Sequence, residues 1–142
     1  MSAEPDTALV ELVEALERRE TTGKGHSRAV ARWAVTLARE VKLHSDHIAV
    51  IEKAGLLHDI GKIEVPSYVL NKPARLTAVE FESIKQHPLI GARIARALPS
   101  CRDAAVAIAH HHERWDGHGY PHGKRGRDIP TEGRILAVAE AF

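Results

Sequence analysis

The stretch SDHIAVIEKAGLLHDIG, residues 45–61, decides the fold that we predict for this chain. Four of its residues, spaced three or four apart, share one face of a helix: Ile48, Ile51, Gly55 and His58. We expect this helix to begin near the cap residue Ser45 and to stop at Gly61. The pair His58 and Asp59 would then lie at the end of a buried helix.

Six further amphipathic helices are predicted from the same helical spacing of apolar residues. The first and last residues of their apolar stripes are Leu9 and Leu16, Val30 and Val41, Phe81 and Ile84, Ile90 and Leu98, Ala105 and His112, and Ile135 and Phe142. Trp33 lies within the second of these stripes, and His26 lies one turn ahead of it. Thr77 and Glu80 fit a capping box, and Pro88 suits a first helical turn. Because no segment alternates apolar and polar residues, we expect an all-α bundle of about seven helices, with residues 61–76 as an ordered loop.

The composition is that of one globular domain with an aliphatic core. The 142 residues are 44% hydrophobic but only 4% aromatic, and a net charge of +1 argues against bulk nucleic-acid binding. The single cysteine, Cys101, excludes an internal disulfide and is expected to be buried. The longest apolar run has six residues, far below the about 20 that a membrane helix needs. We expect a soluble, cytoplasmic domain without a membrane segment.

The ten histidines suggest a metal site. Five of them and one aspartate lie at predicted helix ends or on core-facing stripes: His26, His58, Asp59, His87, His111 and His112. One such histidine is more often a core residue bonded to the backbone, and the helix dipole alone favours histidines at a helix C-terminus. Burying five imidazoles together is costly unless cations satisfy their nitrogens. The other five are expected at the surface: His44, His47, His110, His118 and His122.

The two residues of the His58 and Asp59 pair share a metal only at a helix end, because adjacent helical side chains diverge by about 100°. Asp59 has two carboxylate oxygens and can therefore bridge two cations, which two-metal hydrolases hold about 3.5–4 Å apart. We assign Asp59 as this bridge.

Five segments, in order and spacing, resemble the HD-GYP family, a branch of the HD-domain phosphohydrolases. They are GHSRAV at 25–30, LLHDIGKIEVP at 56–66, LNKPARLTAVE at 70–80, QHPLIGARI at 86–94 and HHERWDGHGYPHG at 111–123. Five motifs in order are far more specific than a lone HD doublet.

The resemblance implies an all-helical domain that hydrolyses cyclic di-GMP to linear pGpG or GMP at two divalent metal ions. Iron or manganese is expected first, with zinc, cobalt and nickel as alternatives. The family's metal-ligand positions fall on His26, His58, Asp59, His87, His111 and His112. Lys62 matches a lysine that contacts metal-bound water or the substrate phosphate; otherwise it is an exposed cation favoured by the helix dipole. Gly119, Tyr120 and Pro121 match the GYP signature, which makes Tyr120 a candidate substrate-binding residue; otherwise this segment is a plain turn.

The sequence departs from the family pattern at three places. Glu140 stands where the family has a metal-ligating aspartate, so it is either a ligand with a longer reach or a solvent-facing carboxylate. Thr22 replaces a glutamate of trinuclear members, which favours a two-metal site. The last helix lacks a C-terminal cap, and we expect further helices and phosphate-binding residues beyond Phe142.

The organisation expected is a lead-in helix over residues 1–20, followed by an HD-GYP-like domain over 21–142 that is incomplete at its C-terminus. An upstream sensor or receiver domain fits the lead-in helix. An uncovered last helix would expose Ile135, Val138 and Phe142 and favour self-association, for instance as a homodimer.

Three functions stay open at this point. The first is a phosphodiesterase for cyclic di-GMP with Asp59 and Lys62 as catalytic residues. The second is a catalytically weak regulatory module that binds nucleotide or a diguanylate cyclase (GGDEF) domain through the GYP loop. The third is an HD-superfamily phosphohydrolase that acts on another nucleotide.

Overall fold

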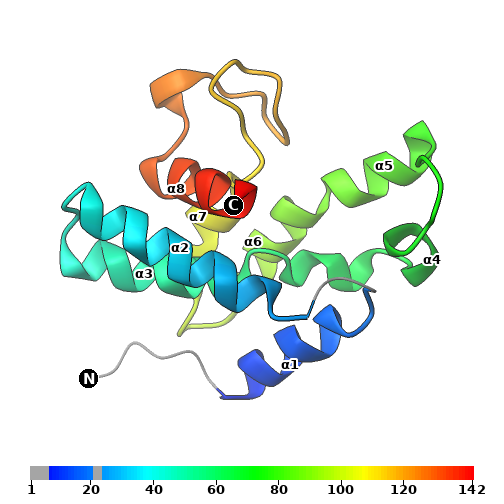
Figure 1. Ribbon diagram of the computed structural model, residues 1–142, viewed down its shortest axis with the longest axis horizontal. Helices are drawn as coiled ribbons and strands as arrows, with labels where there is room; N and C mark the ends of the chain where they lie inside the picture. The colour runs from blue at the N-terminus through cyan, green and yellow to red at the C-terminus, as the bar shows by residue number, and fades with distance from the viewer. Residues whose placement is uncertain (1–6, 21–23) are drawn as a thin grey trace.

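The computed structural model describes residues 7–20 and 24–142, and every regular element in these ranges is helical (Figure 1). In chain order they are α1 (Thr7–Glu17), α2 (His26–Glu40), α3 (Ser45–Leu57), the 3-10 helix η1 (Ile60–Glu64), α4 (Ser67–Leu70), α5 (Ala78–Lys85), α6 (His87–Ala97), η2 (Arg102–Ala104), α7 (Ala105–Ala109), η3 (Gly126–Asp128) and α8 (Thr131–Ala141). The predicted all-α fold is confirmed, and the seven predicted helices correspond to α1, α2, α3, α5, α6, α7 and α8.

Helix ends agree with the sequence where a side chain sets them. Thr77 and Glu80 form both hydrogen bonds of the capping box, and Pro88 lies in the first turn of α6. The cap of α3 differs from the prediction, since the side chain of His44 rather than that of Ser45 accepts the backbone N–H of Asp46, at 3.2 Å.

The segment expected as a loop over residues 61–76 is partly helical. It contains η1 and the one-turn helix α4. In η1 the backbone N–H of Lys62 donates to the Asp59 carbonyl at 3.0 Å, and that of Val65 donates to the Lys62 carbonyl at 2.9 Å. Such i to i+3 turns are too short to produce an apolar period, so no sequence pattern predicts them.

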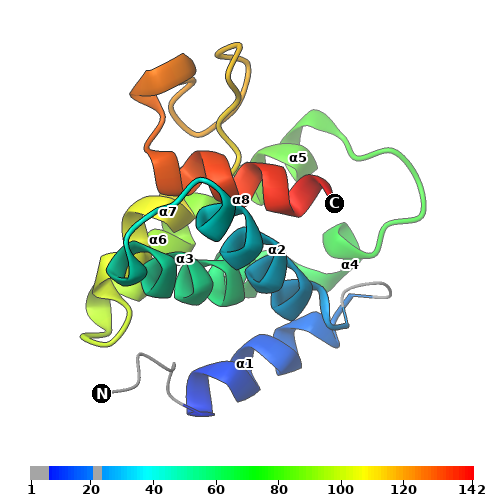
Figure 2. The same cartoon turned by 60° about the vertical axis from the view of Figure 1, so that its left-hand side comes forward.

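The helices form one bundle around an aliphatic core. Helices α2 and α3 lie side by side, α8 crosses α2 and α7, and α6 packs against η1 and α7 (Figures 1 and 2). Helix α1 lies against η1 and α3. The largest fully buried apolar side chains are Ile51, Leu57, Ile108, Ile129 and Leu136, and Cys101 is buried as expected.

Two glycines allow backbones to approach where the site is built. A Cβ on Gly55 of α3 would lie 2.7 Å from the Cα of Ala31, so α2 and α3 can touch only because this side chain is missing. A Cβ on Gly61 would collide with the backbone carbonyl of His87, which places η1 directly against the start of α6.

Four expectations about burial are corrected. Trp33 and Val41 are half-exposed because α3 and α8 cover only the alanine side of α2, and the Trp33 ring stacks on Phe142 at 5.4 Å between centroids. Ile135 is buried, whereas Val138 and Phe142 of the same helix are exposed as predicted. His110 is buried under α8, where Gly133 leaves room for it. Thr22 lies outside the described residues.

Candidate metal centre

Helix ends from five parts of the chain bring the seven predicted ligands together. His26 begins α2, and His58 and Asp59 directly follow α3. His87 begins α6, His111 and His112 follow α7, and Glu140 lies in the last turn of α8. Their donor atoms form two groups in which all atoms lie within 4.8 Å of one another, and Asp59 belongs to both. The first group is His26, His58, Asp59 and Glu140; the second is Asp59, His87, His111 and His112.

The carboxylate of Asp59 divides its oxygens between the two groups. Its Oδ2 lies 3.2 Å from His58 Nε2 and 3.7 Å from His26 Nε2. Its Oδ1 lies 3.1 Å from His87 Nε2 and 3.9 Å from His111 Nε2. This is the arrangement that a bridging carboxylate requires.

Glu140 also faces both groups. Its Oε1 lies 3.6 Å from His58 Nε2 and 3.8 Å from His26 Nε2, while Oε2 lies 3.7 Å from His112 Nε2. Its longer side chain therefore reaches the centre, and Glu140 does not point to solvent.

Backbone carbonyls orient the three most deeply buried imidazoles. The Nδ1 atoms of His58, His87 and His111 lie 2.7, 2.7 and 2.6 Å from the carbonyl oxygens of residues 55, 84 and 108. Because a carbonyl can only accept, each Nδ1 must carry the proton and donate it. In the neutral ring, each Nε2 then presents a lone pair to the centre, as a metal-bound histidine does.

Several buried polar atoms in the centre have no partner of their own. His87 Nε2 and His111 Nε2 lie 3.2 Å apart, although in this tautomer neither can donate to the other. His58 Nε2 and Asp59 Oδ1 are buried and make no hydrogen bond with any described residue. A cation between such atoms would satisfy them, so this donor set fits a metal.

The charges in the centre suit the same purpose. Burial by itself would lower the pKa of His58, but Asp59 and Glu140 outweigh it and raise that pKa to about 10. Burial would raise the pKa of both carboxyls, yet the pKa of Asp59 is held well below the ordinary range by His58, and that of Glu140 by His26 and His58. Burial also lowers the pKa of His111 and His112. Both carboxylates therefore stay ionised and His111 and His112 stay neutral, whereas His58 carries the positive charge that the carboxylates favour. A cation bound between these groups would replace the proton of His58.

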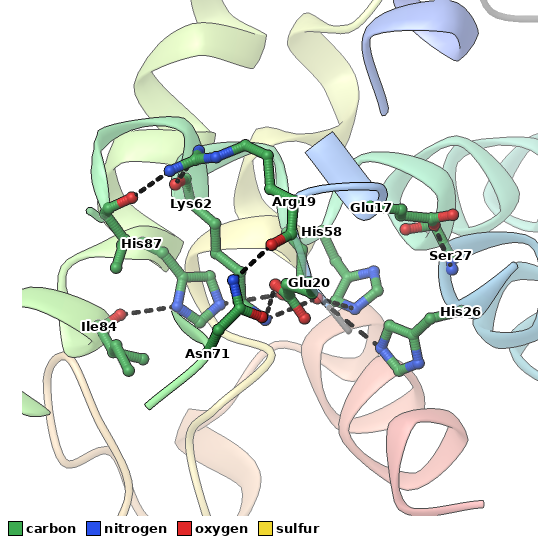
Figure 3. A network of polar contacts seen from close by, with 12 residues as sticks. Glu17, Arg19, Glu20, His26, Ser27, His58, Lys62, Asn71, Ile84 and His87 are labelled. Atoms are coloured by element: carbon green, nitrogen blue, oxygen red, sulfur yellow. Dashed lines mark hydrogen bonds and ion pairs between the residues drawn. The ribbon is translucent and has the colours of Figure 1, made fainter. Parts of the chain in front are cut away.

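Lys62 reaches the edge of the centre from η1. Its Nζ lies 3.3 Å from Asp59 Oδ2 and 3.3 Å from Glu20 Oε1 (Figure 3). Burial would lower the pKa of Lys62, but these two carboxylates raise it, so the ammonium stays protonated. The alternative of a freely exposed surface cation is thereby excluded.

A cleft of about 510 Å³ opens over His112 and Glu140. Tyr120 lies in its wall, stacked on the His112 ring at 4.9 Å and meeting the edge of Phe81 at 6.2 Å. Its backbone N–H donates to the His112 carbonyl at 3.1 Å. Tyr120 thus lies beside His112 in the wall of this cleft. A larger groove of about 730 Å³ lies between α1, α2 and α3 and contains none of the seven ligands.

Sequence reasoning missed two acidic residues around the centre. Glu20 was assigned to a lead-in helix, and no local pattern connects it with Lys62, which is 42 positions away. Glu113 is buried and accepts the backbone N–H groups of His122 and Lys124, both at 3.1 Å, which fixes the loop that carries Tyr120. The only signal for Glu113 was a charged residue directly after the histidine run.

A family model described as "HD domain" matches residues 11–142. The chain belongs to the HD domain family. Among curated relatives, a Thermotoga maritima protein named cyclic di-GMP phosphodiesterase is 41% identical over 128 residues, covering 89% of this chain and 35% of that protein. A Vibrio cholerae protein named 3'3'-cGAMP-specific phosphodiesterase 2 is 38% identical over 133 residues, covering 92% of this chain and 26% of that protein.

A solved structure shares the fold of this HD domain. The crystal structure of a cyclic GMP-AMP specific phosphodiesterase from Vibrio cholerae matches with a TM-score of 0.71 at 19% identity, covering 94% of this chain and 38% of that one. The chain spans about a third of the length of the curated relatives that it matches. The resemblance to the HD-GYP family, seen in the sequence, is confirmed at the level of the family. No helix in the described part of the chain has the length and apolarity to cross a membrane.

Proposed function

We propose that this chain is the hydrolytic domain of a metal-dependent phosphodiesterase for cyclic dinucleotides, with cyclic di-GMP as the first candidate substrate. The observation that carries the proposal is the pair of ligand groups that share Asp59, whose two oxygens face the Nε2 atoms of His58 in one group and of His87 in the other. Two divalent cations, iron or manganese first, would occupy these groups. When bound, they would supply Lewis-acid activation of the phosphodiester and of the attacking water.

The residues of the chain have distinct roles in this proposal. Asp59 connects the two ligand groups, because each of its oxygens faces one of them. The backbone carbonyls keep the imidazole lone pairs aimed inward, so little reorganisation is needed when the cations bind. Lys62, held protonated at the edge of the centre, has three donors and no acceptor, and it is suited to bind a phosphate oxygen and neutralise developing negative charge.

The substrate class rests on the relatives and on the cleft. The relatives reported above are named for cyclic di-GMP and for 3'3'-cGAMP, and both molecules are cyclic dinucleotides. A cleft of about 510 Å³ with Tyr120 and Lys85 in its walls lies within the range of small-molecule sites. We therefore keep 3'3'-cGAMP as the second candidate substrate.

The test is hydrolysis of cyclic di-GMP, 3'3'-cGAMP and a model phosphodiester by the metal-loaded chain. We expect linear products from cyclic di-GMP, and no turnover by Asp59→Asn under the same conditions. Asp46→Asn, which removes an exposed carboxylate at the start of α3, is the matched control and should behave as wild type. Cleavage of the model diester alone would indicate another nucleotide substrate.

A regulatory module is the alternative from a different class. It predicts that the chain binds cations and nucleotide but hydrolyses none of the three compounds. Contact of the GYP loop with diguanylate cyclase domains, a homodimer and an upstream sensor domain stay predictions from the sequence. The turn of Tyr120 toward His112 favours a role of this loop within the site.

A further inference from the structure

The last turn of α1 and the three residues after it reach the metal centre although they supply no ligand. Three side chains make this contact, Glu17, Arg19 and Glu20, and we call them the clasp (Figure 3). They come from the segment for which the sequence predicts a lead-in helix, one that either packs on the domain or continues from a partner module.

Glu17 holds the start of α2, where His26 is the first helical residue. Its Oε2 accepts the backbone N–H of Gly25 and its Oε1 accepts that of Ser27, both at 2.9 Å. The N-cap position is Gly25, whose φ of 78° is left-handed and which has no side chain to cap the helix. Glu17 therefore replaces the missing cap and supplies the negative charge that a helix N-terminus favours.

Arg19 holds the backbone that follows Asp59. Its guanidinium donates to the carbonyl of Lys62 at 3.2 Å and to the carbonyl of Val65 at 2.5 Å. Asn71 secures Arg19 in return, since its side-chain amide donates to the Arg19 carbonyl at 2.6 Å. These bonds connect the end of α1 to η1, to the residue that follows η1 and to the residue that follows α4.

Glu20 completes the clasp through Lys62. The ammonium lies between Glu20 Oε1 and Asp59 Oδ2, at 3.3 Å from each. Lys62 and Glu20 are both mostly buried, which reduces the screening of this pair by solvent.

The clasp contacts only one side of the centre. Within residues 7–20 and 24–142, its side-chain hydrogen bonds end on residues 25–27 and 62–67, next to His26 and Asp59. None reaches the start of α6 or the segment after α7, which carry His87, His111 and His112. Oδ2 of Asp59, the oxygen that Lys62 approaches, is the one that faces His26 and His58.

We propose that the clasp positions His26, which belongs only to the first ligand group, together with Oδ2 of Asp59 and the side chain of Lys62. The three histidines of the second group, His87, His111 and His112, are positioned without it. A displacement of α1 is therefore transmitted to one metal position and to Lys62, and the two metal positions differ in their dependence on α1. This inference rests on the proposed two-cation centre but not on the identity of the substrate.

The experiment is calorimetric titration of the metal-free full chain with Mn²⁺, comparing wild type with Glu17→Ala. We expect one of the two Mn²⁺ affinities to fall about tenfold, as for other residues that orient metal ligands, while the other changes by less than about twofold. The matched control is Glu14→Ala, which removes a carboxylate of the same helix that pairs with Arg28 of α2 and touches no ligand. It should leave both affinities unchanged.

Three results would overturn the proposal that the clasp positions one side of the centre. They are an equal loss of both Mn²⁺ affinities in Glu17→Ala, no loss in Glu17→Ala, and the same loss in Glu14→Ala. If Glu17→Ala does not fold, Glu17→Gln, which keeps one acceptor oxygen, replaces it with an expected loss of about threefold. If wild type binds one Mn²⁺, the two-cation proposal is wrong. The clasp then requires that Glu17→Ala lower the affinity for that single ion and that Glu14→Ala leave this affinity unchanged.

A second measurement separates positioning from simple stabilisation. In Glu20→Gln, Lys62 keeps its ion pair with Asp59 but loses its ion pair with residue 20. We expect kcat for cyclic di-GMP to fall about tenfold while KM, Mn²⁺ content and melting temperature stay as in wild type. A fall in Mn²⁺ content or melting temperature that accounts for the lost activity would contradict positioning by Glu20.

Discussion

At the scale of single residues, the centre depends on carboxylates that face two ways. Asp59 divides its oxygens between the ligand groups, and Glu140 faces His58 with Oε1 and His112 with Oε2. Each histidine, by contrast, faces one group only. Removing a histidine should weaken the binding of one cation, whereas removing Asp59 should weaken the binding of both.

We predict that Asp59→Ala loses both cations and keeps its helices. The helix before it is packed by buried residues such as Ile51 and Leu57, which the substitution does not touch. Elemental analysis of anaerobically purified protein, combined with far-ultraviolet circular dichroism, measures both quantities. Asp46→Ala at the exposed start of α3 serves as the control. Nearly stoichiometric metal in Asp59→Ala would refute the bridge.

Lys62→Ala should lower turnover without removing metal. A protonated ammonium donates hydrogen bonds and cannot ligate a cation, so the ligand set survives the substitution. The loss of one charged donor at the reacting phosphate is expected to cost about 10²–10³ in kcat. Steady-state hydrolysis and metal content are measured together, with Lys72→Ala, whose ammonium pairs with Glu80, as the control. A wild-type rate would remove Lys62 from the catalytic residues.

At the scale of elements, the site is built where helices begin or end. His26 and His87 are first residues of α2 and α6, and His58 follows the last residue of α3. At helix ends the side chains of adjacent residues can point to one place, and unpaired backbone carbonyls are available to bind Nδ1 of a histidine. The glycine of η1 brings two such ends together, because Gly61 lies against the backbone of His87.

Gly61→Ala should therefore destabilise the fold and disturb the centre. A Cβ at this position meets backbone atoms of His87 and lies 2.7 Å from the backbone nitrogen of Gly91, and the backbone cannot move as a side chain can. We expect a loss of about 1–3 kcal/mol in the free energy of unfolding, measured with urea. Gly91→Ala is the comparison, since its nearest neighbour is the methyl end of Ile108 at 3.0 Å. It should cost less than Gly61→Ala.

At the scale of the whole molecule, the ligands connect elements that are distant in the sequence. The first group joins α2, the end of α3 and α8, and the second joins the end of α3 with α6 and the segment after α7. Cations bound there would link α2, α3, α6, α7 and α8, whose places in the bundle are seen in Figures 1 and 2. Since the unfolded chain cannot assemble these donors, binding energy adds to the free energy of folding.

Metal should accordingly raise the thermal stability of the whole domain. With Mn²⁺ at one hundred times its dissociation constant, each site is expected to add about 2.7 kcal/mol to the free energy of unfolding. Calorimetric melting with added Mn²⁺, and again after chelation, measures the effect. The gain should vanish in Asp59→Ala and persist in Asp46→Ala. A melting temperature that does not change with Mn²⁺ would contradict a centre that links the bundle.

The local features of this HD domain could be predicted from the sequence. The capping box at Thr77, the proline start of α6 and the position of Asp59 at the end of α3 depend on residues within one or two turns. Helical hydrogen bonds join residues four apart, so apolar spacing and caps carry this information. The candidate ligand residues could also be chosen from the sequence, because their side-chain chemistry and motif spacing are properties of the sequence, and the structure brings them together.

Only the tertiary structure decided how these residues are arranged around the two ligand groups. The division of Asp59 between two groups, the inward reach of Glu140 and the protonation of each Nδ1 all depend on distances between separate helices. The contact of Glu20 with Lys62 spans 42 positions and follows no period. Such contacts arise from how helices pack, and the packing is set by the sum of many buried apolar contacts, which no local pattern contains.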